Sequence, residues 1–157
     1  MDLSRLWFWL SLIPSAVFLY YIVERNIAAF RARPRITRKD IVYQEFFASG
    51  CSEKNFLTKL GGGNNCLRLV VTGDLLWVTS WFPFSLIAPI YDGVHVIPLA
   101  RITSVERSRQ RFTSLDGLLL SYSDAAGGSH TLRLVPKGLK RFIEAIEAGV
   151  KVPIRKS

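Results

Sequence analysis

Cysteine and histidine are scarce in this sequence. The 157 residues include two cysteines, Cys51 and Cys66, and two histidines, His95 and His130. The cysteines form no C-x-x-C pair and have no histidine near them, so they do not match the usual zinc patterns. Each histidine stands alone in a strand-like segment, where packing is the ordinary role. We therefore expect no metal and no cofactor.

Signatures of catalysis are also missing. The sequence has no nucleophile elbow, no paired carboxylates at a useful spacing and no dinucleotide fingerprint. The glycines at positions 61–63 lack the following lysine and hydroxyl residue of a phosphate-binding loop, and they indicate a flexible connection instead. These absences make an enzyme the least favoured interpretation, and we expect none.

Acidic residues are outnumbered by basic ones. The chain has 12 Asp and Glu against 21 Lys and Arg, a formal net charge of +9. The excess is shared between the first forty residues and the rest. This balance suits a protein held beside an anionic membrane, and no nucleic-acid-binding motif accompanies it, so nucleic acid is not an expected partner.

Charge is absent from Leu6 to Val23 (LWFWLSLIPSAVFLYYIV). A helix of this length reaches about 27 Å, close to the hydrocarbon thickness of a bilayer. Aromatic rings, among them Trp9 and Tyr20, lie toward both ends, where they favour the membrane interface. The stretch has no polar face, and no good signal-peptide cleavage site follows it. The sequence therefore predicts a transmembrane helix.

A cluster of basic residues follows the uncharged stretch: Arg31, Arg33, Arg35, Arg38 and Lys39. Positive residues stay on the cytoplasmic side of a membrane, so this cluster predicts an external amino terminus and a cytoplasmic remainder. The cluster either sets this topology alone or also contacts anionic lipid headgroups. We expect a single-pass protein of the inner membrane, with the lipid bilayer as its first partner.

Short strand signals fill the region after the basic cluster. Cys66–Thr72 and Leu75–Ser80 flank a two-residue turn, which predicts a hairpin. Asp40–Phe47 fits either a strand or a helix, and a short helix is expected to begin near Ser52. Four more strands are predicted at His95–Leu99, Ile102–Arg111, Leu118–Ser123 and His130–Val135.

The period of the apolar residues changes near the carboxyl end. Leu139, Phe142, Ile143 and Ile146 follow the spacing of one helix face, and the pattern runs from 137 to 148 between a proline and a glycine. The predicted fold is therefore mainly β with a carboxy-terminal helix, preceded by one transmembrane helix.

Two segments carry a resemblance to a known family. His95–Glu106 (HVIPLARITSVE) fills an I-P-L-x-x-I-x-x-V strand pair, and Cys66–Ser80 is similar to the opening hairpin of bacterial PH-like proteins. With the strand order and the final helix, residues 42–149 resemble the PH-like superfamily, which includes PH and GRAM domains. The resemblance implies a partly open antiparallel barrel of about seven strands, plugged by the helix, and a role in binding lipid headgroups or protein segments. The first hairpin is short and acidic, unlike the basic hairpin of phosphoinositide-binding PH domains.

The chain thus divides into four predicted parts. Residues 1–32 form the transmembrane helix and its extension, and residues 33–41 form a basic juxtamembrane linker. Residues 42–149 form the PH-like domain, and residues 150–157 form a basic tail.

Arg107, Arg109 and Arg111 form the first candidate binding site. Side chains alternate along a strand, so these three would share one face and could clamp phosphates or an acidic peptide. The same row also fits an edge strand whose charges prevent aggregation.

The apolar segment Phe82–Tyr91, broken by two prolines, forms the second candidate site. Its residues Phe82, Phe84 and Ile87 either cap the core or contact the membrane or a partner. Tethering by the anchor would favour contact with the same bilayer.

These patterns lead to one functional hypothesis and one alternative. We expect a membrane-anchored binding module on the cytoplasmic face that binds an unknown protein partner or anionic lipid. The alternative is a structural subunit of a larger membrane complex with no ligand of its own.

Overall fold

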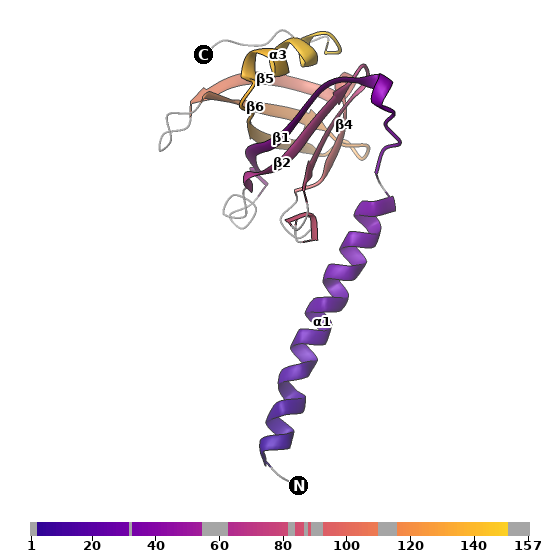
Figure 1. The fold of residues 1–157 in the computed structure, drawn as a ribbon, viewed down its shortest axis with the longest axis vertical. Helices are drawn as coiled ribbons and strands as arrows, with labels where there is room; N and C mark the ends of the chain where they lie inside the picture. The colour runs from indigo at the N-terminus through magenta and orange to yellow at the C-terminus, as the bar shows by residue number, and fades with distance from the viewer. Residues whose placement is uncertain are drawn as a thin grey trace.

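The computed structural model describes residues 3–31, 33–54, 63–81, 84–86, 88, 93–109 and 116–150. Helix α1 (Leu3–Arg31) leads away from a β-sheet domain, and the short turn η1 (Arg38–Asp40) precedes the first strand (Figure 1). The domain ends in helix α3 (Leu139–Glu147), which lies at the end of the sheet opposite to α1.

Seven strands in the described part of the chain form one antiparallel sheet, in the order β4-β3-β2-β1-β7-β6-β5. The mainly β fold with a carboxy-terminal helix is therefore confirmed, as is the hairpin of β2 and β3. The bounds are β1 (Ile41–Ser52), β2 (Gly63–Thr72), β3 (Leu75–Ser80), β4 (His95–Pro98), β5 (Ile102–Arg109), β6 (Asp116–Ser123) and β7 (Ser129–Val135).

Some predicted boundaries need correction. The ambiguous segment after Asp40 is a strand, and it continues to Ser52, where the sequence predicted the start of a helix. Ser52 is buried and pairs with Leu132 of β7, so long-range pairing prevails over its local preference as a helix cap. The rest of that predicted helix, residues 55–62, lies outside the described residues.

Strand β1 pairs with two different strands. Its pairing with β2 runs from Ile41 to Gly50, and its pairing with β7 runs from Ser49 to Ser52, so Gly50 pairs with both. At Gly50 the two strands approach so closely that a Cβ atom would lie 2.5 Å from the backbone oxygen of Arg133. Glycine is therefore required where β1 pairs with β2 and β7 at once, and β1 joins β2–β4 to β5–β7.

The curled sheet is tied across its two halves by a buried hydrogen bond. The edge strands are β4 and β5. His95 Nδ1 of β4 and the Tyr122 hydroxyl of β6 lie 2.8 Å apart, and both side chains are buried. A satisfied buried pair of this kind fixes the position of β4 relative to β6.

Helix α3 covers the core as its periodicity predicted. Phe142, Ile143 and Ile146 are buried, while Leu139 is half-buried against the same cluster. The Phe142 ring contacts the Tyr43 ring of β1 at a centroid distance of 5.4 Å. The helix thereby closes one end of the sheet with apolar side chains.

The start of α3 is held by a carboxylate from a distant strand. Glu45 of β1 accepts hydrogen bonds from the backbone N–H groups of Lys137 and Gly138, at 2.7 and 3.2 Å. These donors precede a helix whose own N-cap residue, Gly138, offers no side chain. A negative charge at a helix N-terminus is favourable, so Glu45 both positions and stabilises α3.

The predicted membrane span coincides with α1, but its membrane role finds no support in the structure. Within the stretches that are described, no helix combines the length and apolar character needed to cross a bilayer. The side chains of residues 6–11, part of the predicted span, lie outside the described set. The transmembrane assignment therefore stays a prediction.

The close approach at Gly50 predicts that one added methyl group lowers the stability more at this position than at an open glycine. Gly50→Ala should lower the free energy of unfolding by about 1–3 kcal/mol, because backbone on both strands must shift. Gly73→Ala, in the β2–β3 turn, is the control: its Cβ would meet nothing within 4 Å, and the change should stay below about 0.5 kcal/mol. Denaturant titration of the full chain in detergent, followed by tryptophan fluorescence, measures both. Equal effects would contradict the tight crossing.

Candidate functional site

Four aromatic side chains form a continuous group, here called the aromatic surface, in which three rings are exposed and the fourth, Trp81, is half-buried. It consists of Phe46 and Phe47 of β1, Trp81 after β3, and Phe84 of the turn η2 (Phe84–Leu86). Successive ring centroids lie 6.5, 5.4 and 5.5 Å apart. The three phenylalanines are 46%, 45% and 42% exposed, an unusual amount of aromatic area to leave in water.

A β-bulge explains why two consecutive phenylalanines face outward. Phe46 pairs with Arg68 and Ala48 with Leu67, so the pairing register shifts at Phe47. Phe47 has a φ of +67°, in the left-handed region, and Ala48 is fully buried. A bulge re-aims side chains in this way, and left-handed backbone costs a residue other than glycine about 1–2 kcal/mol. The bulge therefore places the Phe47 ring on the surface, although the backbone at Phe47 is strained.

Trp81 is fixed by the start of β2. Its indole Nε1–H donates a hydrogen bond to the backbone oxygen of Asn65 at 3.3 Å, and its backbone N–H donates to Cys66 at 3.1 Å. The N–H of Asn65 donates in turn to the Ser49 hydroxyl at 2.9 Å. The ring at the centre of the aromatic surface is thus held by β1, β2 and β3 together.

Cations lie over the rings of the aromatic surface. The Arg68 guanidinium is 4.9 Å from the Phe46 centroid and 5.5 Å from that of Trp77. The Lys137 ammonium is 5.6 Å from the Phe47 centroid. Contacts of this kind are attractive, and they place positive charge beside exposed aromatic area.

The aromatic surface extends toward the side of the domain from which α1 departs. Figure 1 shows η2, the short rose-coloured turn below β4, at the lower edge of the domain, while α1 extends downward from the same side. Helix α3 lies at the opposite end. Phe84 and the carboxyl end of α1 therefore share one end of the molecule.

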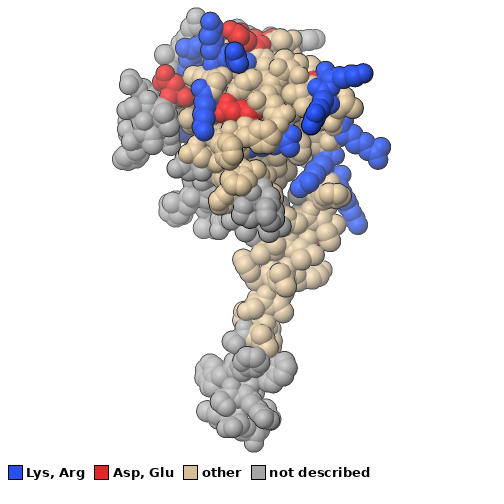
Figure 2. Space-filling view, viewed as in Figure 1, with Lys and Arg blue, Asp and Glu red and all other residues tan. Residues whose placement is uncertain are grey.

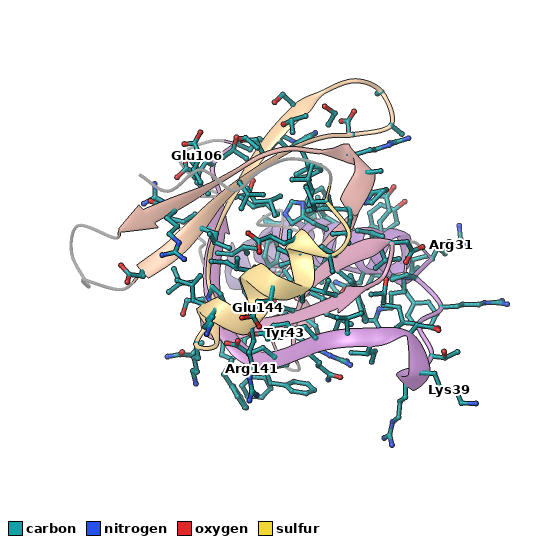
Figure 3. All side chains as sticks on the ribbon, turned by 90° about the horizontal axis from the view of Figure 1, so that it is seen from above. Arg31, Lys39, Tyr43, Glu106, Arg141 and Glu144 are labelled. Atoms are coloured by element: carbon teal, nitrogen blue, oxygen red, sulfur yellow. The ribbon has the colours of Figure 1, made fainter. Side chains whose placement is uncertain are left out.

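The predicted basic cluster lies between α1 and β1. Arg31, Arg33, Arg35, Arg38 and Lys39 are all exposed. Figure 2 shows Lys and Arg side chains gathered on the flank where this linker runs, and Figure 3 places Arg31 and Lys39 on that side. The Arg33 guanidinium lies 5.1 Å from the Phe30 ring, so the cluster begins directly at the apolar helix.

The structure describes only part of the other predicted sites. Arg107 is exposed on the edge strand β5, whereas the Arg109 side chain and Arg111 lie outside the described residues. Of the apolar segment, Phe84 is exposed, while Phe82 and Ile87 also lie outside them. These assignments stay predictions.

Sequence reasoning missed most of the aromatic surface. Phe46, Phe47 and Trp81 were not identified, nor were the cations Arg68 and Lys137. The signal for the first two was present: adjacent phenylalanines break the alternation of a half-buried strand, which is the pattern of a bulge. The contribution of Lys137 depends on the return of the chain after β7 and has no local signal.

A cavity with both polar and apolar lining lies between β1 and α3. It has a volume of about 460 Å³ and is lined by Val42, Tyr43, Gln44, Arg141, Glu144 and Ala145, of which Figure 3 labels three. Burial, and then a hydrogen bond from the Tyr43 hydroxyl to the Glu45 carboxylate, raise the pKa of Tyr43. The hydroxyl therefore stays neutral and serves to hold Glu45 at the start of α3.

The two histidines belong to a packed network. His130 Nε2 lies 2.8 Å from the Asp124 carboxylate, and the His130 ring stacks on the Tyr122 ring. The Tyr122 hydroxyl forms the hydrogen bond with His95 described above. The bond to His130, followed by that from the Gly128 N–H, lowers the pKa of Asp124. Among the described residues, no group of three or more His, Cys, Asp or Glu side chains is placed to hold a metal ion.

Comparison with known proteins gives no match for this chain, either among family models or among curated proteins. Neither cysteine forms a disulfide, and burial raises the pKa of Cys66, so this thiol is protonated and weakly reactive at neutral pH. The aromatic surface is thus the site whose geometry points most directly to a binding role.

The strain at Phe47 is testable with two substitutions that both remove its ring. Asparagine tolerates the left-handed region, whereas a β-branched valine does not. Phe47→Val should therefore be less stable than Phe47→Asn by about 1 kcal/mol or more. Denaturant titration of the two full-length variants measures the difference. Equal stability would mean that Phe47 is not held in the left-handed region.

Proposed function

We propose that this chain is a single-pass membrane-anchored binding module. In this proposal α1 crosses the inner membrane, with the amino terminus outside and the sheet domain at the cytoplasmic face. The uncharged stretch Leu6–Val23 supports it, as does the continuous α1 of 29 residues that contains this stretch. The exposed basic linker directly after the helix supports the orientation.

We further propose that the sheet domain is PH-like. Seven antiparallel strands, the tie between β4 and β6, and a final helix over one end are consistent with a partly open barrel of that class. Such an arrangement is typical of binding domains, although fold alone does not name a ligand. The ligand must be inferred from the surface.

The observation that carries the binding role is the aromatic surface. Exposed apolar patches rimmed by charge mark contacts with membranes or other proteins. Here three exposed phenylalanine rings and the half-buried Trp81 lie beside Arg68 and Lys137, and Phe47 joins them through a strained backbone. We propose that this surface binds anionic lipid or a protein partner.

A structural role in a larger membrane complex is the second candidate. An apolar groove of about 660 Å³ runs along the carboxyl half of α1, lined mainly by Leu19, Ile22, Val23, Ile27 and Phe30. Another membrane helix would fill such a groove, and the domain would then organise its neighbours without a ligand of its own.

Membrane anchoring is tested by extraction and by topology. The full chain should remain in the membrane pellet after carbonate washing, and a reporter fused to its carboxyl end should be active only in the cytoplasm. Phe18→Asp should release a large fraction, because a carboxylate near the centre of a span costs about 2.5–3.5 kcal/mol. Phe18→Leu should behave as the unmodified chain.

Release of the unmodified chain by carbonate would contradict the anchor. A reporter active only outside the cell would contradict the orientation while leaving the anchor in place.

A further inference from the structure

We propose that the aromatic surface docks into the headgroup region of the same anionic bilayer that α1 enters, so that the domain lies on the membrane with its η2 end down. This inference rests on the proposed anchoring. It goes further by naming the ligand as the anionic lipid surface itself and by assigning an orientation to the domain.

The short linker keeps the domain at the membrane. An extended chain covers at most about 3.5 Å per residue, so the segment between Arg31 and Ile41 reaches roughly 30 Å, and η1 shortens it. Docking is then intramolecular, and a weak surface contact suffices because its effective concentration is high.

The direction of α1 selects which end of the domain meets the membrane. Phe84 and η2 lie at the end from which α1 departs, and α3 lies at the other end (Figure 1). With the carboxyl end of α1 at the membrane surface, η2 faces the headgroups and α3 faces the cytoplasm. The rings of Phe84, Trp81 and Phe47 follow one another at centroid distances of 5.5 and 5.4 Å, so the series continues from η2 to β1.

The residue types suit an interface between water and lipid. Aromatic rings, tryptophan above all, prefer the headgroup level of a bilayer. Trp81 already satisfies its indole N–H within the protein, so its ring enters apolar surroundings without an unpaired donor.

Charge complementarity favours lipid over a protein partner. Arg68 and Lys137 lie over rings of the aromatic surface, and the exposed cations of the linker occupy the flank nearest α1. The nearby carboxylate of Glu45 is engaged by Tyr43 and by two backbone N–H groups at the start of α3. Positive charge thus accompanies the rings, as an anionic headgroup layer requires.

Spin-label depth measurements test this arrangement in the full chain. The protein, with Cys51→Ala and Cys66→Ala, is reconstituted into nanodiscs that contain phosphatidylglycerol. Single labels are placed at Ser85→Cys, which leaves all four rings intact, at Val17→Cys within α1, and at Glu147→Cys on the exposed face of α3. Relaxation by oxygen against a water-soluble nickel complex reports the depth of each label.

We expect oxygen to relax the labels at positions 85 and 17 more strongly than the nickel complex does, and the reverse for the label at position 147. The double variant Phe47→Ser and Phe84→Ser removes two rings. In this variant the ratio of oxygen relaxation to nickel relaxation at position 85 should fall to the value measured at position 147. The same ratio at position 17 should stay unchanged. Nanodiscs of phosphatidylcholine alone should also lower the ratio at 85.

The outcomes separate this inference from the anchoring. A lipid-exposed label at 17 with an aqueous label at 85 overturns docking and leaves the anchor intact. An aqueous label at 17 overturns the anchor. A ratio at position 85 that does not change in phosphatidylcholine overturns the requirement for anionic lipid. If the label at position 85 is shielded from nickel only in native membranes, the aromatic surface binds a protein instead of lipid.

Discussion

The position of β1 between β2 and β7 is the constraint on which this molecule depends. The strand pairs with β2 as far as Gly50 and with β7 from Ser49 to Ser52, so in the described strand order β1 is the element that joins β2–β4 to β5–β7. The buried hydrogen bond between His95 and Tyr122 then ties the two halves a second time. Where the two pairings of β1 overlap, Gly50 lets the backbone of β7 approach to a distance that a Cβ would prevent.

A bulge in β1 at Phe47 creates the candidate site. A straight strand would place Phe46 outward and Phe47 inward, but the bulge places both outward and returns Ala48 to the core. The strain at Phe47 is local, whereas the forces that maintain it are distant: pairing on both sides, the Glu45 contact with α3 and the packing of Phe142. Strain held in this way is a feature of functional surfaces, which is why the aromatic surface is the best-supported binding site.

Positive charge and aromatic area reach this surface from separate parts of the chain. Arg68 comes from β2, Lys137 from the turn before α3, and the linker cations from the segment before β1. The histidines, by contrast, serve the fold: His95 and His130 connect β4, β6 and β7 through Tyr122. The histidines thus form a packed polar network that shares no residue with the cationic and aromatic surface.

Local pattern in the sequence determined the hairpin of β2 and β3, the later strands and the buried face of α3, because periods of 2 and 3.6 residues reflect only neighbouring residues. It also singled out Phe84 and the basic linker. It failed at Ser52, where pairing with β7 outweighs the local preference for a helix cap. Only the tertiary structure decided which side chains join the aromatic surface. Trp81, Arg68 and Lys137 reach Phe46 and Phe47 through strand pairing and through the return of the chain after β7, and these partners lie far along the chain from the rings that they meet.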